Sequence, residues 1–146
     1  MTTHTDEMNE AQVYALRIAD EVRALDALLA DPYEKDLRAA YLAELELTHL
    51  EETADGGDIL HTWLNETVLD VSVLIDTRPD TLNGRVSLLR TSGGPRCEIN
   101  RDTHDGSTVV VECWWASDYG RVSVWAGHLA SFLDELVEIH EPADFD

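Results

Sequence analysis

The spacing of apolar residues changes from a helical period to a strand period near residue 68, and this change constrains the fold more than any other feature of the chain. Residues 9–30 carry apolar side chains every three to four positions, which is typical of an amphipathic helix. Residues 69–76 instead alternate apolar and polar side chains, as a half-buried strand does. A chain that keeps the two periods in separate blocks is expected to have an α+β fold, with helices on one face of a mostly antiparallel sheet.

Capping and turn residues predict two further helices before the strands begin. A proline follows Asp31, and this pair favours a helix that starts at residue 32 with Asp31 as its N-cap. We expect this helix to span residues 32–53 and to end at Gly56-Gly57. Asp58 is then expected to cap a short third helix over residues 59–65.

Turn residues divide the rest of the chain into five strands and a closing helix. Asp105-Gly106 is a strong signal for a tight hairpin turn. Because Cys97 and Cys113 are equally far from the centre of this turn, we expect them to face each other on neighbouring strands. The strands are expected at residues 69–76, 85–90, 96–102, 107–115 and 121–125, with a helix over 127–139.

The length and composition favour one folded domain. A chain of 146 residues, of which 44% are apolar, can bury a hydrophobic core without disulfide bonds. We expect a single domain over residues 1–146. Its parts are an acidic helical region (1–65), an antiparallel sheet (66–126), a closing helix (127–140) and an acidic tail (141–146).

The net charge of −20 is concentrated at the two ends of the chain. Residues 1–80 contain 19 acidic and five basic residues, residues 81–130 contain five of each, and residues 131–146 contain six acidic and no basic residues. A surface with this much negative charge repels nucleic-acid phosphates and anionic membranes. We therefore expect neither nucleic acid nor a membrane as a direct partner. Nor is there an apolar run of the roughly 18 residues that a membrane span needs, or a basic-then-apolar start, so we expect a cytoplasmic protein.

One segment resembles a known group of proteins. Leu88 to Pro95 reads L-L-R-T-S-G-G-P, and it is followed by Cys97, Ile99 and the run Glu112-Cys113-Trp114-Trp115. The stretch from about residue 60 to 137 is similar to short proteins of phages, prophages and their hosts that carry an L-L-x-T-[ST]-G-G-P segment. The resemblance implies an accessory protein of a mobile element that acts in host–phage conflict, and it supplies no catalytic residue.

Three groups of residues are candidate chemical sites. Gly93-Gly94-Pro95 is either an anion-binding nest of backbone N–H groups or a tight turn or bulge between strands, and the turn is favoured. Cys97 and Cys113 form a disulfide, half of a metal site or, as we favour, two buried thiols, because no Cys-x-x-Cys or matching histidine pair accompanies them. The six histidines are scattered, and we favour surface or capping roles for them over a metal or acid–base site in which His49 and His61 approach Glu52 or Glu66.

Aromatic residues in the last two strands are a candidate binding surface. Trp114 and Trp115 are adjacent in a predicted strand, so their side chains point to opposite faces of the sheet. One is expected to pack beneath a helix, and the other to join Trp125 or Tyr119 in an interaction surface if the far face is open. We include Trp115 among the partner-binding residues.

The carboxylates of the predicted helices are the main candidate binding groups. Carboxylates spaced along helices imitate the phosphates of a duplex, which carries about one charge per 1.7 Å of its axis. The predicted partner-binding residues are Glu34, Glu44, Glu51, Glu52, Asp55, Asp134, Glu135 and Glu138, together with Trp115.

These features favour a small acidic inhibitor from a phage or mobile element that blocks a basic, nucleic-acid-binding partner such as a nuclease, a restriction enzyme or a CRISPR effector. No catalytic residue, metal or cofactor is expected. A homodimer would use the sheet edge or the aromatic face, because acidic helices repel their own copies. The alternative is a protein of a halophile or an actinobacterium whose acidity serves only solvation.

Overall fold

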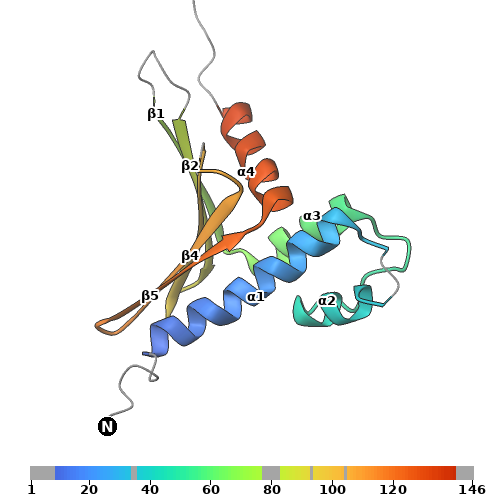
Figure 1. Cartoon of the computed structure of the whole chain (residues 1–146), viewed down its shortest axis with the longest axis horizontal. Coiled ribbons are helices and arrows are strands. Elements are labelled where there is room, and N and C mark those ends of the chain that lie inside the picture. The colour runs from blue at the N-terminus through green and yellow to red at the C-terminus, as the bar shows by residue number, and fades with distance from the viewer. Residues whose placement is uncertain (1–8, 34–35, 77–82, 93, 104, 141–146) are drawn as a thin grey trace, which may run out of the picture.

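The computed structural model of the chain has four α-helices and one five-stranded antiparallel sheet in its described part, so the predicted α+β class is confirmed (Figure 1). The structure describes residues 9–33, 36–76, 83–92, 94–103 and 105–140. In chain order the elements are α1 (Glu10–Ala30), α2 (Arg38–Glu44), α3 (Gly56–Thr67), β1 (Asp70–Asp76), β2 (Asn83–Thr91), β3 (Arg96–Asp102), β4 (Thr108–Trp115), β5 (Asp118–Trp125) and α4 (Gly127–His140).

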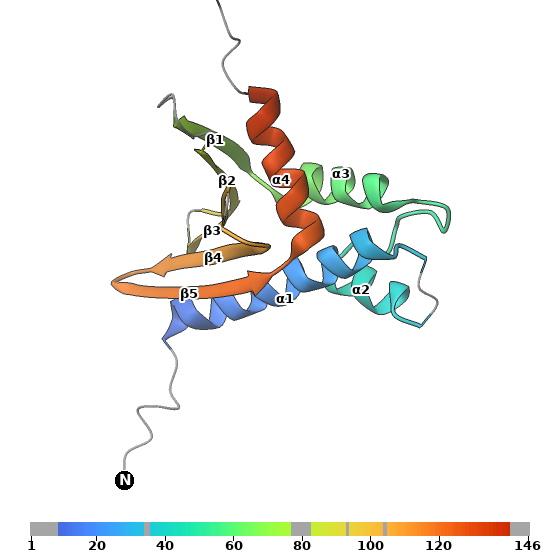
Figure 2. The same ribbon diagram turned by 45° about the horizontal axis from the view of Figure 1, so that its top comes forward.

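The strands lie in the sheet in the order β1-β2-β3-β4-β5, each antiparallel to its neighbours. The helices lie on one side of this sheet, where α1 contacts β4 and β5 and α4 contacts mainly β1 and β2 (Figure 1, Figure 2). α2 and α3 pack against α1. We call the helix-covered side of the sheet the inner face and the opposite side the outer face.

Small residues let α1 lie very close to the inner face. Ala11, Ala15 and Ala19 recur at every fourth position of α1 and are fully buried. Opposite them, a Cβ atom on Gly120 of β5 would lie 2.5 Å from backbone atoms of Ala11 and Gln12. The glycine is therefore required by this contact rather than by its backbone angles.

All five predicted strands and the closing helix are present, with ends that differ from the expected ones by three residues or fewer. The predicted facing of Cys97 and Cys113 is confirmed, since the two residues are directly paired between β3 and β4. The irregularity expected near the Gly-Gly-Pro segment is also present, as a register shift between Leu89 and Thr91 of β2.

The predicted long helix over residues 32–53 is wrong. Among the described residues of this range only 38–44 are helical, and Glu46 has a left-handed backbone angle φ of 58° that ends the helix. The chain then turns so that Leu45 and Leu47 are both buried. Residues two positions apart do not share a helix face, so a continuous helix would expose one of these leucines.

The predicted caps are also corrected. Asp31 is the C-cap of α1 rather than the N-cap of a second helix, and its side chain accepts a hydrogen bond from the Tyr33 N–H. Gly56-Gly57 begins α3 instead of ending α2. The N-cap of α3 is Asp55, and Asp58 completes a reciprocal capping box with it.

Candidate protein-binding surface

Buried charged groups join the helices to the sheet, and they remove some carboxylates from the surface. Asp26 of α1 accepts hydrogen bonds from the N–H groups of His128 and Leu129, at 2.8 and 3.0 Å, and so caps the first turn of α4. Glu21 of α1 accepts from the indole N–H of Trp63 at 2.8 Å and from Arg90 at 3.2 Å. Each of these acids is bonded within the fold.

Asp134, a predicted partner-binding residue, has a structural role of the same kind. It forms a two-point ion pair with the guanidinium of Arg101, with distances of 2.9 and 3.0 Å. Arg101 is only 3% exposed and also donates to the carbonyls of Asp105 and Thr108. The pair therefore fastens α4 to β3, and Asp134 is held away from free interaction with a partner.

The remaining predicted carboxylates separate into two surfaces. The first is the segment of residues 38–54, which we call the α2 segment and which exposes the predicted Glu44, Glu51 and Glu52. It also exposes Glu46, which was not among the predicted residues. The second is the exposed side of α4, with Glu135 and Glu138. α2 packs on α1 while α4 lies over β1 and β2, so the two surfaces are separate (Figure 1).

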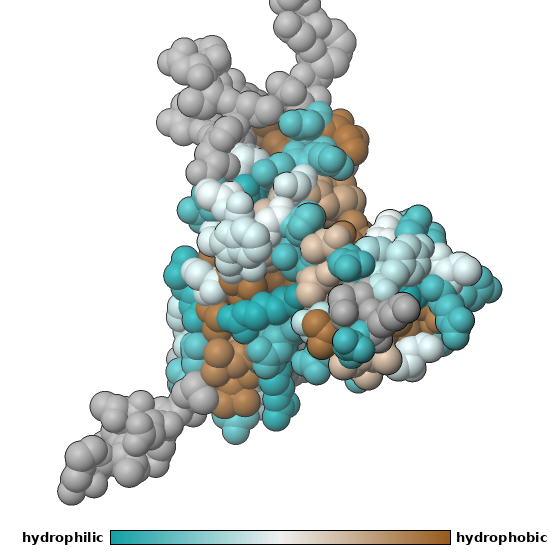
Figure 3. Space-filling model, turned by 45° about the vertical axis from the view of Figure 1, so that its right-hand side comes forward, coloured by the Kyte–Doolittle hydropathy of each residue, from teal (hydrophilic) through white to brown (hydrophobic). Residues whose placement is uncertain are grey.

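Arg38 holds the α2 segment together from within. Its guanidinium donates to the carbonyls of Pro32, Glu51 and Ala54, and it lies over the ring of Tyr33. This brings both ends of the segment together without neutralising a carboxylate. Figure 3 shows hydrophilic residues along the rim of the part of the molecule built from α2 and α3.

No described arginine forms an ion pair with these exposed carboxylates. Five of them form ion pairs with acids elsewhere, namely Arg23, Arg85, Arg90, Arg96 and Arg101. No ion pair joins the four glutamates of the α2 segment to another described residue. Glu34 lies outside the described residues, and Asp55 is engaged in the capping box.

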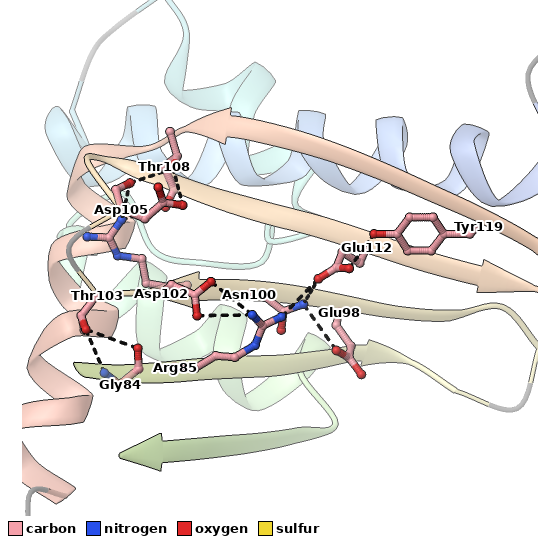
Figure 4. A network of polar contacts seen from close by, with 11 residues as sticks. Gly84, Arg85, Glu98, Asn100, Asp102, Thr103, Asp105, Thr108, Glu112 and Tyr119 are labelled. Atoms are coloured by element: carbon pink, nitrogen blue, oxygen red, sulfur yellow. Dashed lines mark hydrogen bonds and ion pairs between the residues drawn. The ribbon is translucent and has the colours of Figure 1, made fainter. Parts of the chain in front are cut away.

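The outer face of the sheet carries a polar network that the sequence analysis did not find (Figure 4). Its centre is Glu112 of β4, which accepts hydrogen bonds from Arg85 at 3.2 Å, Asn100 at 2.8 Å and the Tyr119 hydroxyl at 2.6 Å. Arg85 also pairs with Asp102 at 3.1 Å. The network therefore links four strands. The alternation of side chains along each strand could have placed these residues on one face, but only after the pairing of the strands was known.

Glu112 and Tyr119 shift each other's titration. Burial acts to raise the pKa of Glu112, but the hydrogen bonds from Tyr119 and Asn100, together with the charges of Arg85 and Arg121, outweigh it and lower the pKa. The pKa of Tyr119 is raised because its hydroxyl donates to the Glu112 carboxylate. Both shifts keep the carboxylate ionised and the phenol protonated near neutral pH.

The hairpin between β4 and β5 exposes aromatic side chains on both sides of its tip. Trp114 and Tyr119 contact each other on the outer face, with ring centroids 5.5 Å apart. Trp115 lies on the inner side, where it makes an edge contact of 6.4 Å with Tyr14 of α1. The Trp that joins Tyr119 is therefore Trp114, whereas Trp115 belongs to the side that packs beneath a helix. Trp125 is 70% exposed.

The Gly-Gly-Pro segment offers no free flanking cation. Gly93 lies outside the described residues, and Gly94 and Pro95 form a bend between β2 and β3. Arg90 is paired with Glu21 and Arg96 with Glu98. These contacts support the turn interpretation over the anion nest.

Among the histidines, His49 contacts Glu66 at 2.9 Å, as the less favoured arrangement requires, while His61 is exposed on α3. Within the described ranges there is no group of three or more His, Cys, Asp or Glu residues arranged to hold a metal ion.

Comparisons with known proteins give no relative for this chain. No family model, no curated protein and no solved structure matches it. A search of the described helices finds none that is long and apolar enough to cross a membrane.

Proposed function

We propose that the protein is an acidic inhibitor that binds the basic, nucleic-acid-binding surface of a partner protein, such as a nuclease, a restriction enzyme or a CRISPR effector. It acts by occupying that surface, without catalysis, in the cytoplasm of the host cell of a phage or mobile element. The observation that carries the proposal is the α2 segment, where four exposed carboxylates lie within nine residues and none is paired to a described cation.

Electrostatics favours the α2 segment over the acidic side of α4 as the main contact. Asp134 is already bonded to Arg101, which leaves α4 with fewer free carboxylates near its middle. A concentrated negative surface also accelerates the encounter with a basic partner. The aromatic tip of the β4–β5 hairpin supplies a second type of contact, since exposed Trp and Tyr side chains are common anchors in protein interfaces.

The test is capture on the tagged full-length chain, followed by identification of the retained protein and competition with duplex DNA. We expect a basic nucleic-acid-binding protein that DNA displaces and whose affinity falls steeply as salt rises. The Glu51→Gln/Glu52→Gln variant should bind less tightly than Glu135→Gln/Glu138→Gln. Because both variants remove two charges, the difference isolates the local contact from the net charge.

Two outcomes would contradict the proposal. A chain that folds only at molar salt and retains no basic protein would indicate that the acidity serves solvation. Equal losses of affinity in the two double variants would contradict the assignment of the contact to the α2 segment.

We propose that any self-association uses the edge of the sheet formed by β1 or the outer face of the sheet. The side chains of Asn9 and Gln12 bond to backbone groups of Tyr119 and Arg121, so α1 covers the edge formed by β5. β1 forms the opposite edge and exposes Val71 and Leu74. A homodimer would therefore use β1 or the outer-face aromatic residues.

A further inference from the structure

The two cysteines occupy a pairing position in which side chains approach most closely. Cys97 of β3 lies directly opposite Cys113 of β4. In an antiparallel pair, opposed residues alternate between hydrogen-bonded positions and non-hydrogen-bonded positions, and side chains are closer at the latter. The alternation around Cys97 can be read from backbone bonds at both ends of the sheet.

Two backbone bonds set this alternation. The Thr103 N–H donates to the carbonyl of Gly84, which makes the odd residues of β3 bond toward β2. The Ala126 N–H donates to the carbonyl of Ser107, which makes the odd residues of β4 bond toward β5. Cys97 and Cys113 both have odd residue numbers, so the backbone of Cys97 bonds to β2 and that of Cys113 bonds to β5. The Cys97–Cys113 pair is therefore a non-hydrogen-bonded pair between β3 and β4.

This position suits a disulfide across the two strands. Opposed Cβ atoms at such a position are about 4.5 Å apart, near the range of separations that disulfides span. The two thiols are also close enough to shift each other's pKa. Closing the bond therefore needs only a small adjustment of the side chains.

The surroundings make Cys97 the reactive member of the pair. The interaction with the Cys113 thiol lowers the pKa of Cys97 against the effect of burial, and Thr91 and the charge of Arg90 act in the same direction. The hydrogen bond and burial raise the pKa of Cys113. Cys97 also lines a cavity of about 370 Å³ between α1, β2, β3 and the α2 segment. The charged residues that line it are Arg17 and Arg90 together with Glu21, Glu44 and Glu46.

Burial limits which oxidant can reach the site. Neither cysteine has exposed surface, so a large reagent cannot contact the sulfur atoms in the folded protein. A peroxide is close to water in size and can enter the cavity that Cys97 lines. Because the sulfur of Cys97 is itself fully covered, its contact with the peroxide requires a local opening of the cavity wall, and a small molecule needs a smaller opening than a bulky reagent does.

We propose that Cys97 and Cys113 are a redox-modification site that a small peroxide converts into a cross-strand disulfide. The Cys97 thiolate attacks one peroxide oxygen, the O–O bond breaks, and Cys97 becomes a sulfenic acid while hydroxide leaves. The Cys113 thiol then attacks the Cys97 sulfur, the S–O bond breaks, and water leaves with the Cys113 proton. Overall, two thiols are oxidised, and hydrogen peroxide, the probe used below, is reduced to two molecules of water.

The experiment treats the folded full-length chain with hydrogen peroxide, then unfolds it, alkylates the remaining thiols and maps the peptides by mass spectrometry. We expect both thiols to disappear together and a Cys97–Cys113 peptide to appear in a chain that remains monomeric. A bulky aromatic disulfide reagent should react far more slowly with the folded protein than with the protein in urea. The wild-type chain alone is sufficient for these measurements.

Single variants then assign the order of reaction. In Cys113→Ser, Cys97 should accumulate as a sulfenic acid that dimedone traps when the peroxide-treated protein is unfolded, whereas in Cys97→Ser the remaining Cys113 should stay a thiol under the same exposure. Retention of both thiols in the peroxide-treated wild type, or a disulfide that joins two chains, would overturn the proposal. Equal trapping in the two variants would overturn the assignment of Cys97 as the attacking thiol.

Discussion

The two faces of the sheet use charged residues in opposite ways. On the inner face Arg101 is buried among apolar neighbours, and it is bonded to one carboxylate and two carbonyls. On the outer face Arg85, Glu98 and Glu112 are partly exposed, and each contacts more than one polar partner. Because an unpaired charge costs far more in the interior than at the surface, the inner pairs hold the fold together while the outer network is adaptable.

Glu21→Ala should have the largest effect and break the inner arrangement. It removes the acceptor of the buried indole N–H of Trp63 and of the partly buried guanidinium of Arg90. We expect a loss of about 3–5 kcal/mol of unfolding free energy, measured by urea denaturation. Glu98→Ala on the outer face, which removes the partner of exposed Arg96, should cost only about 1 kcal/mol. Similar losses in the two variants would contradict the distinction between the faces.

Gly120→Ala should destabilise the protein by about 3 kcal/mol, because the new methyl group meets the backbone of α1 at a distance that no side-chain rotation relieves. Gly57→Ala is the matched control on exposed α3, where the nearest atom is 3.4 Å away, and its effect should be small or favourable. Thermal and urea unfolding of both variants test this difference. A mild Gly120→Ala variant would mean that α1 does not approach the sheet this closely.

Glu112→Gln should remove a pH-dependent part of the stability. Since the folded pKa of Glu112 lies below its ordinary value of 4.5, its contribution is present above pH 4.5 and is lost as the pH falls through the folded pKa. The difference in unfolding free energy between the wild type and Glu112→Gln should therefore shrink from pH 7 to pH 3. Tyr119→Phe, which removes one bond to the same carboxylate, should show the same trend with a smaller amplitude.

Ala116→Gly should have the smallest effect on stability, and it should stabilise the protein slightly rather than destabilise it. Ala116 lies in the tight turn between β4 and β5 with a left-handed φ of 54°, a region that costs an L-residue about 1 kcal/mol and that glycine adopts freely. Glycine also gains freedom in the unfolded chain, and this offsets part of the gain. We therefore expect the unfolding free energy to rise by about 0.5 kcal/mol or less. A clear loss of stability would show that the Ala116 side chain makes a contact at the tip.

The strands and the pairing of the cysteines were predictable because they depend on local information. Alternating side chains and the Asp105-Gly106 turn set the register of β3 and β4, and that register places Cys97 opposite Cys113. α1 and α4 were likewise visible as continuous apolar stripes. The Asp55-x-x-Asp58 spacing was also present in the sequence, and it specifies the true start of α3.

The remaining features depended on contacts between distant segments, which local periodicity does not contain. Residues 45–53 have a helix-compatible pattern, yet burying Leu45 and Leu47 together against the rest of the core ends α2 at Glu44. Nothing in the spacing of 30 acids distinguishes Glu21, Asp26 and Asp134, which are bonded inside the fold, from Glu51 and Glu52, which face solvent. The sequence determined the α+β order and the excess of negative charge. Only the tertiary structure decided which carboxylates are free, because that depends on which arginines and N–H groups the fold brings to them.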